Sequence, residues 1–221
     1  MKEEQTINGF PKGWKHVKMG EIFTIERGGS PRPIDEFITE NSDGINWIKI
    51  GDTKGVNKYI TATKEKIKPA GVARSRMVYD GDFILSNSMS FGRPYIMRTS
   101  GCIHDGWLVI RQNENIDNDF LYYILSSSGV YQQFTKLAKG STVKNLNIEA
   151  VKQVELTIPP KETQQQIVSK IEELFSELDK GIEELKTAQQ QLKVYRQAVL
   201  KWAFEGKLTN GDVKNGELPE G

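Results

Sequence analysis

The chain has 221 residues, of which 37% are hydrophobic and 27% charged, and its formal net charge is +1. This composition is typical of a globular protein and excludes fibrous and disordered classes, and the length allows one ordinary domain with an appendage. Its polar N-terminus lacks the apolar stretch of a signal peptide, and no apolar run approaches the ~18–20 residues of a membrane span. We therefore expect a cytoplasmic protein without membrane contact.

Cysteine and histidine are scarce. The single cysteine, Cys102, excludes an intramolecular disulfide and is expected to be a small buried hydrophobe. Cys102, His16 and His104 lack the spacing of a metal cluster, so we expect no metal site. Charge is unevenly distributed: residues 1–160 are mildly basic and the remainder mildly acidic, which is compatible with DNA binding by the first part but does not demand it.

Residues 1–160 predict a mixed α+β (or α/β) domain. Short apolar runs bounded by Gly, Pro, Asn and Asp predict strands at 17–25, 45–50, 82–85, 94–97, 107–110 and 154–158. Apolar residues at helical spacing predict helices at 120–125 and 129–137, with a helical turn at 148–151. These elements contain enough apolar side chains to form a core of their own.

Residues 161–206 predict one long helix, roughly 65 Å long at ~1.5 Å per residue. Thr163 and Gln166 fit a capping box at its start, and Gly206 fits its end. Apolar residues recur at alternating spacings of three and four, which is a coiled-coil seam made of Ile171, Leu174, Leu178, Gly181, Leu185, Ala188, Leu192, Tyr195, Val199 and Trp202. A glycine on the seam suggests a close approach by a partner, because Gly costs ~1 kcal/mol against Ala inside a helix. The alternative is a helix that folds back on its own domain.

The two ends of the chain resemble each other. Residues 8–14 read N-G-F-P-K-G-W, and residues 215–221 read N-G-E-L-P-E-G, so F-P-K-G and L-P-E-G superpose after a shift of one residue. We therefore interpret residues 207–221 as a linker toward a second repeat of the same domain.

Motifs of catalysis are mostly absent from the sequence. It contains neither a Walker-type phosphate loop nor the cofactor loop and Asn/Asp-Pro-Pro-aromatic element of a methyltransferase. Asp52-Thr53-Lys54 resembles a nuclease motif but is better explained as a turn at a strand end. His104-Asp105 lacks a nucleophile at a convincing spacing, and a buried or turn histidine is favoured. We expect a chain without catalytic residues.

Three polar and basic segments are the predicted DNA contacts. Lysine and arginine side chains suit phosphates, while Ser, Thr and Asn suit phosphates or base edges. An ordinary solvated loop is the alternative for each segment. The predicted contacts are Arg27, Ser30 and Arg32 in the first segment, Ser86, Asn87, Ser88 and Arg93 in the second, and Lys136, Lys139, Ser141, Thr142, Lys144 and Asn145 in the third.

An ordered set of short motifs resembles the specificity subunit of type I restriction–modification systems. The motifs are P-x-G-W at 11–14, R-G-G-S-P at 27–31, W-I-K-I-G-D at 47–52, D-G-D-F-I-L-S at 80–86, K-G-S-T at 139–142 and L-T-I-P-P at 156–160, followed by residues 164–171 of the long helix. Members of this family carry target-recognition domains, each followed by a helix that acts as a spacer and docks methyltransferase subunits.

The resemblance implies double-stranded DNA, methyltransferase and restriction subunits as partners, with S-adenosylmethionine, ATP and magnesium on those partners and no cofactor on this chain. The family usually has two recognition domains, whereas this sequence has one, so a single chain would read a half-site. A homodimer through the helix seam would complete the site. Two alternatives remain: an accessory DNA-binding domain of a nuclease or methyltransferase with its own active site, and a coiled-coil scaffold.

Overall fold

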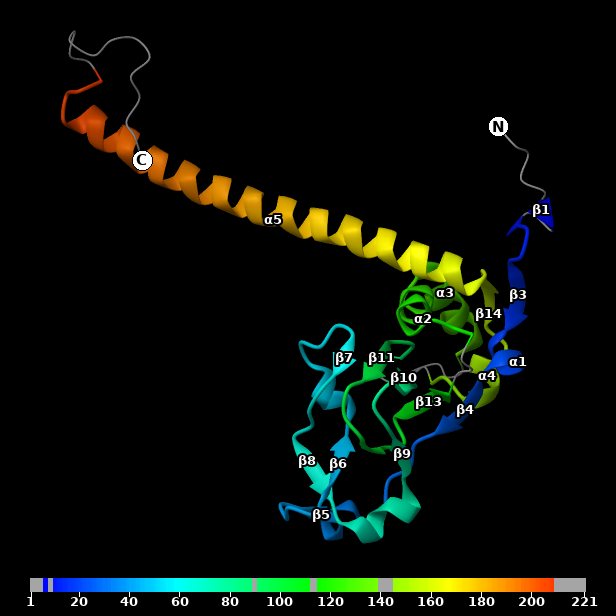
Figure 1. Ribbon diagram of the computed structural model, residues 1–221. Helices are drawn as coiled ribbons and strands as arrows, with labels where there is room; N and C mark the ends of the chain where they lie inside the picture. The colour runs from blue at the N-terminus through cyan, green and yellow to red at the C-terminus, as the bar shows by residue number, and fades with distance from the viewer. Residues whose placement is uncertain (1–5, 8–9, 89–90, 112–114, 139–144, 209–221) are drawn as a thin grey trace. The chain divides into compact units, whose positions relative to one another are not determined.

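A computed structural model describes residues 6–7, 10–88, 91–111, 115–138 and 145–208 (Figure 1). The chain divides into two compact units, Met1–Val168 and Ser169–Gly221. The first unit is a mixed α and β domain, as predicted, and the second consists mainly of one helix. Among the described helices, none has an apolar stretch long enough to cross a membrane.

A five-stranded sheet forms the centre of the first unit. Its neighbours are antiparallel except for the parallel pair of β11 and β7. Side chains of β10, β11 and β13 are buried on both faces, which explains why these strands read as continuous apolar runs in the sequence. In spatial order the strands are β4 (Thr24–Arg27), β13 (Trp107–Arg111), β10 (Phe83–Ser86), β11 (Pro94–Met97) and β7 (Tyr59–Ile60).

A second five-stranded sheet packs on one face of the first. It is mixed, with β6 and β12 parallel, and its edges carry short 3₁₀ turns. Its strands in spatial order are β5 (Ile38–Thr39), β8 (Glu65–Ile67), β6 (Ile45–Ile48), β12 (Gly101–Ile103) and β9 (Arg76–Val78), and the turns are η1 (Ile34–Glu36), η2 (Ile50–Thr53) and η3 (Pro69–Arg74). Cys102 is fully buried, as predicted, and burial raises the pKa of its thiol.

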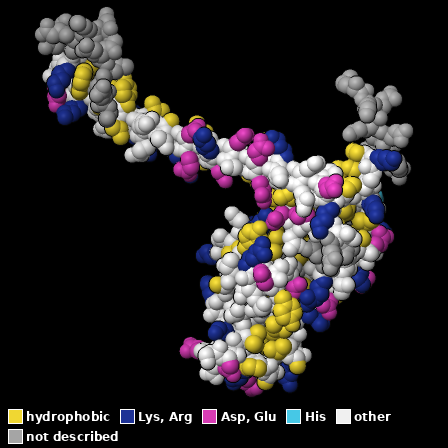
Figure 2. Space-filling model, in the orientation of Figure 1, with side chains coloured by type: hydrophobic (Ala, Val, Ile, Leu, Met, Phe, Trp, Pro, Cys, Tyr) yellow, Lys and Arg dark blue, Asp and Glu magenta, His cyan; other side chains and the backbone are white. Residues whose placement is uncertain are grey.

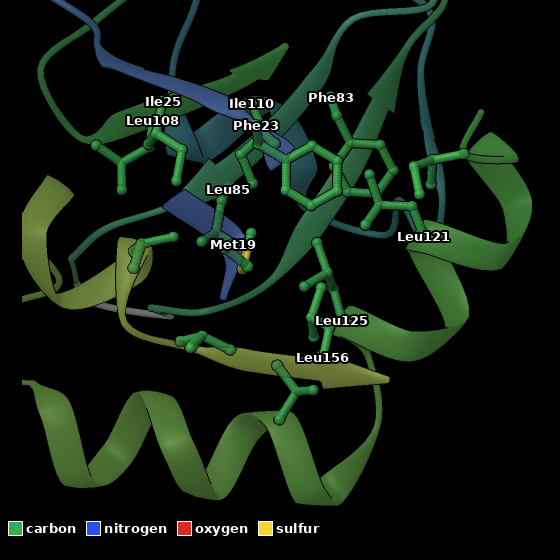
Figure 3. Packing of buried hydrophobic residues seen from close by; sticks show 14 of the residues in the cluster. Met19, Phe23, Ile25, Phe83, Leu85, Leu108, Ile110, Leu121, Leu125 and Leu156 are labelled. Carbon is green, nitrogen blue, oxygen red and sulfur yellow. The ribbon is translucent and has the colours of Figure 1, made fainter. Parts of the chain in front are cut away.

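Helices cover the other face of the central sheet. Along β10 and β13, alternate side chains enter different cores: Phe83 and Leu108 meet the helices, whereas Ile84 and Val109 meet the second sheet. Figure 3 shows Phe83, Leu85 and Leu108 gathered with Met19, Leu121, Leu125 and Leu156 in the helical layer. That layer contains α1 (Met19–Ile22), α2 (Asn118–Leu125), α3 (Ser128–Leu137), α4 (Ile148–Lys152) and the two-stranded sheet of β3 (Lys15–Lys18) and β14 (Glu155–Ile158).

Side-chain caps explain where α2, α3 and α4 begin. The Asp117 carboxylate accepts the backbone N–H groups of Asp119 and Phe120, the Ser127 hydroxyl accepts that of Val130, and the Asn147 amide oxygen accepts that of Ala150. The three helices predicted in this region are therefore confirmed. A further two-stranded sheet, β1 (Thr6–Ile7) with β2 (Phe10–Pro11), precedes them in the chain.

Two predicted strands are wrong in extent. The strand expected at 17–25 is interrupted by α1, because Met19 turns into the core and the Glu21 carboxylate accepts the Lys18 N–H at 2.9 Å. The chain thereby passes from the sheet of β3 and β14 to the central sheet. The strand expected at 45–50 ends at Ile48, and η2 follows, closed by the Asp52 carboxylate on the Lys49 N–H. Asp52-Thr53-Lys54 is thus a structural turn.

The long helix, α5 (Lys161–Phe204), has 44 residues. It begins directly after Pro160, whose carbonyl accepts the Gln164 N–H at 3.0 Å, so Thr163 lies inside the first turn and the predicted capping box is wrong. The compact first unit extends past residue 160 to Val168, since Gln164 and Val168 are buried in it. At the other end, Gly206 has a φ of 72°. Its N–H bonds to Ala203 and that of Lys207 to Trp202, so Gly206 ends the helix as predicted.

Candidate nucleic-acid interface

The glycine-rich segment after β4 lies against the turn between β12 and β13. Gly28 N–H donates to the Trp107 carbonyl at 2.9 Å, and Gly29 N–H donates to the Ile103 carbonyl at 3.1 Å. A Cβ atom at position 28 would stand 2.1 Å from the His104 carbonyl oxygen, which leaves room only for glycine. The backbone contact therefore fixes the position of Ser30 and Arg32, which follow.

Asp105, in that turn, holds the first predicted segment. Its carboxylate accepts the Ser30 hydroxyl at 3.0 Å and lies 3.6 Å from the Arg32 guanidinium, and its carbonyl accepts Arg27 Nε at 3.0 Å. Burial alone would raise the pKa of Asp105, but the Ser30 hydrogen bond and neighbouring charges outweigh it, and the pKa lies below its ordinary value. Arg27 and Arg32 remain exposed, with the Arg32 side chain 82% accessible.

Asn87, in the second predicted segment, bonds to the turn that holds the first segment and to the residue that follows the third. Its N–H donates to the Gly106 carbonyl at 3.0 Å, and its side-chain amide donates to the Asp105 carbonyl at 2.9 Å. Its own carbonyl accepts the N–H of Leu146, the residue after Asn145, at 2.9 Å. Segments separated by more than a hundred residues in the sequence are thus brought side by side.

The burial of Ser86 and Asn87 corrects the prediction of direct contacts there. Each is 1% exposed. The Ser86 hydroxyl accepts the Arg93 N–H at 3.1 Å, so it closes the β10–β11 turn and is not available to a ligand. These two side chains position the loops instead. In the same segment Ser88 is half-buried and Arg93 is exposed.

The third predicted segment is described only at its ends. Lys136, in the last turn of α3, and Asn145 are both exposed. The predicted contacts Lys139, Ser141, Thr142 and Lys144 lie outside the described residues. The structure thus supports the placement of Asn145 beside the other segments through Leu146, while the contacts of this segment stay a prediction.

Two further basic residues also lie in this region: Arg74, a weaker candidate from the sequence together with Arg76, and Lys49, which the sequence did not indicate. Arg74 Nη1 donates to the Arg32 carbonyl at 3.4 Å, and Lys49 forms an ion pair with Glu65. Lys49 lines a hollow of about 390 Å³ together with Ser30, Arg32 and His104. Arg74 belongs to the polar run Arg74-Ser75-Arg76, whereas Lys49 stands between two isoleucines, and only the pairing of distant strands reveals its location.

His104 is a structural histidine of the turn, in agreement with the sequence interpretation. Its side chain is 19% exposed, and Nε2 accepts the Ile50 N–H at 3.1 Å. Nδ1 faces the Gly106 N–H at 2.6 Å and lies 3.5 Å from the Asp105 carboxylate. Burial lowers the pKa of His104 and outweighs the raising effect of Asp105, which favours the neutral ring. In the described residues, no cluster of three or more His, Cys, Asp or Glu could hold a metal ion.

The predicted seam of α5 is mostly exposed. Leu174, Leu178, Leu185 and Leu192 are between 49% and 72% accessible. Ile171, Tyr195, Val199 and Trp202 are partly covered, and no described atom outside the helix backbone stands within 4 Å of a Cβ built on Gly181. A row of exposed leucines at coiled-coil spacing is typical of a helix surface that packs against another helix.

The family model of the type I restriction modification DNA specificity domain matches residues 11–187, and the chain belongs to this family. The chain is 27% identical to the EcoBI specificity subunit of Escherichia coli over 95% of its own length, and 25% identical to the MjaIX specificity subunit of Methanocaldococcus jannaschii over 76%. It covers only 43% and 39% of those two proteins.

Solved structures confirm the fold with its long C-terminal helix. The HsdS subunit from Thermoanaerobacter tengcongensis superposes with a TM-score of 0.64 over 90% of this chain and 46% of that one, at 22% identity. A chain from a study of complex assembly and conformational transition of the type I R-M system gives a TM-score of 0.67 at 21% identity, covering 90% and 47%. The present chain therefore spans about half the length of these relatives.

Proposed function

We propose that this chain is a DNA-specificity component of a type I restriction–modification complex, and that its first unit reads a half-site of double-stranded DNA. The observation that carries the proposal is that Asp105 and Asn87 hold the first two predicted segments together, with Leu146, directly after the third, bonded to Asn87. Arg27, Arg32 and Arg93 are exposed on these fixed loops. In this role the chain performs no catalysis, and the partner methyltransferase and restriction subunits supply the chemistry and its cofactors, S-adenosylmethionine, ATP and magnesium.

The interface has the chemistry that DNA backbones require. Arginine forms bidentate hydrogen bonds with phosphates and with guanine edges, and exposed Ser or Asn side chains add donors and acceptors. The negative charge of Asp105 is offset locally, because its carboxylate accepts the Ser30 hydroxyl and lies 3.6 Å from the Arg32 guanidinium. The rigid frame reduces the entropy lost when the loops meet DNA.

We also propose that α5 pairs with α5 of a second copy, in antiparallel orientation. Residues 169–184 carry two basic and six acidic side chains, whereas residues 185–204 carry four basic and no acidic ones. Figure 2 shows acidic side chains grouped along the first half of the helix and hydrophobic side chains exposed toward its C-terminal end. An antiparallel pair centred near Leu185 sets each acidic half against a basic half, while a parallel pair would set like charges together.

Salt-dependent binding to duplex DNA tests the first proposal. Arg32→Gln and Lys136→Gln should each weaken binding across sequences and reduce the slope of log K against log salt by about one. Arg98→Gln is the matched control. Arg93 directly precedes β11 and Arg98 directly follows it, so Arg98 lies at the opposite end of the strand, where its guanidinium is 3.7 Å from the Asp80 carboxylate. Equal slopes for all three variants would overturn the proposed interface. Magnesium-dependent cleavage of DNA by the chain alone would instead support an accessory domain with its own active site.

The mass in solution, alone and with a methyltransferase subunit, tests the pairing of α5. Gly181→Leu and Ala188→Leu should lower the dimer fraction while the far-ultraviolet spectrum of the first unit is retained. Ser176→Leu, on the opposite side of the helix, is the matched control and should leave the dimer unchanged. A tighter dimer in Gly181→Leu would contradict the close approach at that glycine, and a monomeric wild-type chain would overturn the homodimer.

A further inference from the structure

A cavity of about 470 Å³ opens in the first unit between the β10–β11 turn and helices α2 and α3. Tyr95 and Leu125, which are 2% and 0% exposed, form part of its wall and belong to the core of the domain. Part of the cavity wall is therefore made of side chains that are packed in the core of the first unit. The cavity itself is not filled by any described side chain.

Aromatic rings dominate the cavity. Phe91 and Tyr131 stack with centroids 5.8 Å apart and an interplanar angle of 19°, although Tyr131 is 47% exposed. Tyr122 is fixed from two sides: its hydroxyl donates to the Asn57 carbonyl at 3.0 Å, and the Lys58 ammonium lies 5.3 Å from its ring centroid. Fixed, accessible rings of this kind offer faces on which a planar group can stack.

The charge of the cavity is positive. Among the described lining residues Arg93 is the charged one, and none is a carboxylate. Both backbone polar groups of Arg93 are bonded to Ser86: its N–H donates to the Ser86 hydroxyl at 3.1 Å and its carbonyl accepts the Ser86 N–H at 3.1 Å. Gly92 has a φ of 76°, and a Cβ there would meet the Phe134 ring at 2.9 Å, so this position requires glycine.

Stacking faces, one arginine and no acid fit a planar aromatic ligand that carries a negative charge. A nucleotide has this chemistry: bases stack on aromatic side chains regardless of sequence, and phosphates bind arginine. We propose that this cavity binds one nucleotide of the bound DNA after its base has left the helical stack. The inference rests on the proposed DNA-binding function, because Arg93 lines the cavity and also belongs to the second predicted DNA-contact segment, where its N–H donates to the Ser86 hydroxyl.

Saturation-transfer NMR with dAMP and deoxyadenosine as probes tests the cavity separately from duplex binding. We expect the base protons of both probes to receive saturation, and dAMP to bind more tightly. Tyr131→Ala should weaken both probes about tenfold, the effect of losing one stacking ring. Arg93→Gln should weaken dAMP and leave deoxyadenosine unchanged. Tyr79→Ala is the matched control, since Tyr79 is a comparably exposed tyrosine, 54% accessible, that does not line the cavity.

The outcomes separate this inference from the proposed function. Loss of dAMP signal in Tyr131→Ala but not in Tyr79→Ala supports the nucleotide site. Absence of saturation transfer to dAMP in a chain that still binds duplex DNA overturns the nucleotide site alone. If N-acetyltryptophanamide binds as well as dAMP and Arg93→Gln affects neither, the cavity receives an aromatic side chain of a protein, and the proposal is wrong. Failure to bind any DNA would overturn the proposed function as well.

Discussion

Gln164 joins the first turn of α5 to the rest of the first unit, and its removal should be costly. Its side-chain oxygen accepts the Asp117 N–H at 2.8 Å, and its amide donates to the Pro159 carbonyl at 2.9 Å and to the Asn115 carbonyl at 3.3 Å. The side chain is 1% exposed, so water does not replace these bonds when it is truncated. We therefore expect Gln164→Ala to destabilise the first unit.

The size of the effect follows from the partners that are left unpaired. A buried polar group without a hydrogen bond costs about 1–3 kcal/mol. Asp117 N–H and the Pro159 carbonyl both lose their partner, so the free energy of unfolding should fall by about 2–6 kcal/mol. With a urea m-value of about 2 kcal/mol per molar, the unfolding midpoint should fall by about 1–3 M. The gain in helix propensity from Gln to Ala is only a few tenths of a kcal/mol and does not offset this loss.

Urea unfolding followed by tryptophan fluorescence measures the change, because Trp47 and Trp107 are buried in the first unit. Gln165→Ala is the matched control: it makes the same substitution one residue later, at an exposed position of the same helix. Its free energy of unfolding should stay within about 0.5 kcal/mol of the wild-type value. Equal midpoints for Gln164→Ala and Gln165→Ala would refute the attachment of α5 through Gln164.

Gly92→Ala should lower the free energy of unfolding by about 2–4 kcal/mol, because it combines a positive φ with a contact against Phe134, and an unchanged Tm would contradict this. For His104, burial lowers the pKa in the folded state below 6.5, so the unfolded chain binds the proton more tightly. Stability should be fully present above about pH 6.5 and fall as the pH drops toward the folded pKa, a dependence that His104→Gln should reduce in urea titrations at pH 7 and pH 5. Cys102 is fully buried with a raised thiol pKa, so a thiol reagent should label it only after unfolding; rapid labelling of the folded chain would show the site to be open.

The long buried strands and the helices could be predicted from sequence because their patterns are local. β10, β11 and β13 are buried on both faces, so their apolar runs stand out, and α2 and α3 show helical spacing with a cap in front. Short strands such as β7 and β12 could not be predicted, since two or three residues carry no period and depend on a distant partner strand. The single turn of α1 was missed for the same reason.

Composition identified the loops of the candidate site but not the role of each side chain. Ser86 and Asn87 have the polarity of ligand contacts, yet their partners are Arg93, Asp105 and Gly106, and both are buried. Arg74 and Lys49 come to this region through the pairing of strands that are far apart in the sequence. Which polar groups face solvent is set by the tertiary fold, whereas which segments are polar is already visible in the sequence.

The residues that hold the loops of the candidate interface in place differ from the residues that those loops expose to solvent. The bonds that involve Asn87 with Asp105, Gly106 and Leu146 all use backbone groups of these neighbours, so they do not depend on which side chains the surrounding loops display. Exposed positions such as Arg32 and Asn145 are free to change without altering the backbone that presents them. Under the proposed function, a single scaffold of this design would suit many different target sequences, because a new specificity would require new loop surfaces and no new fold.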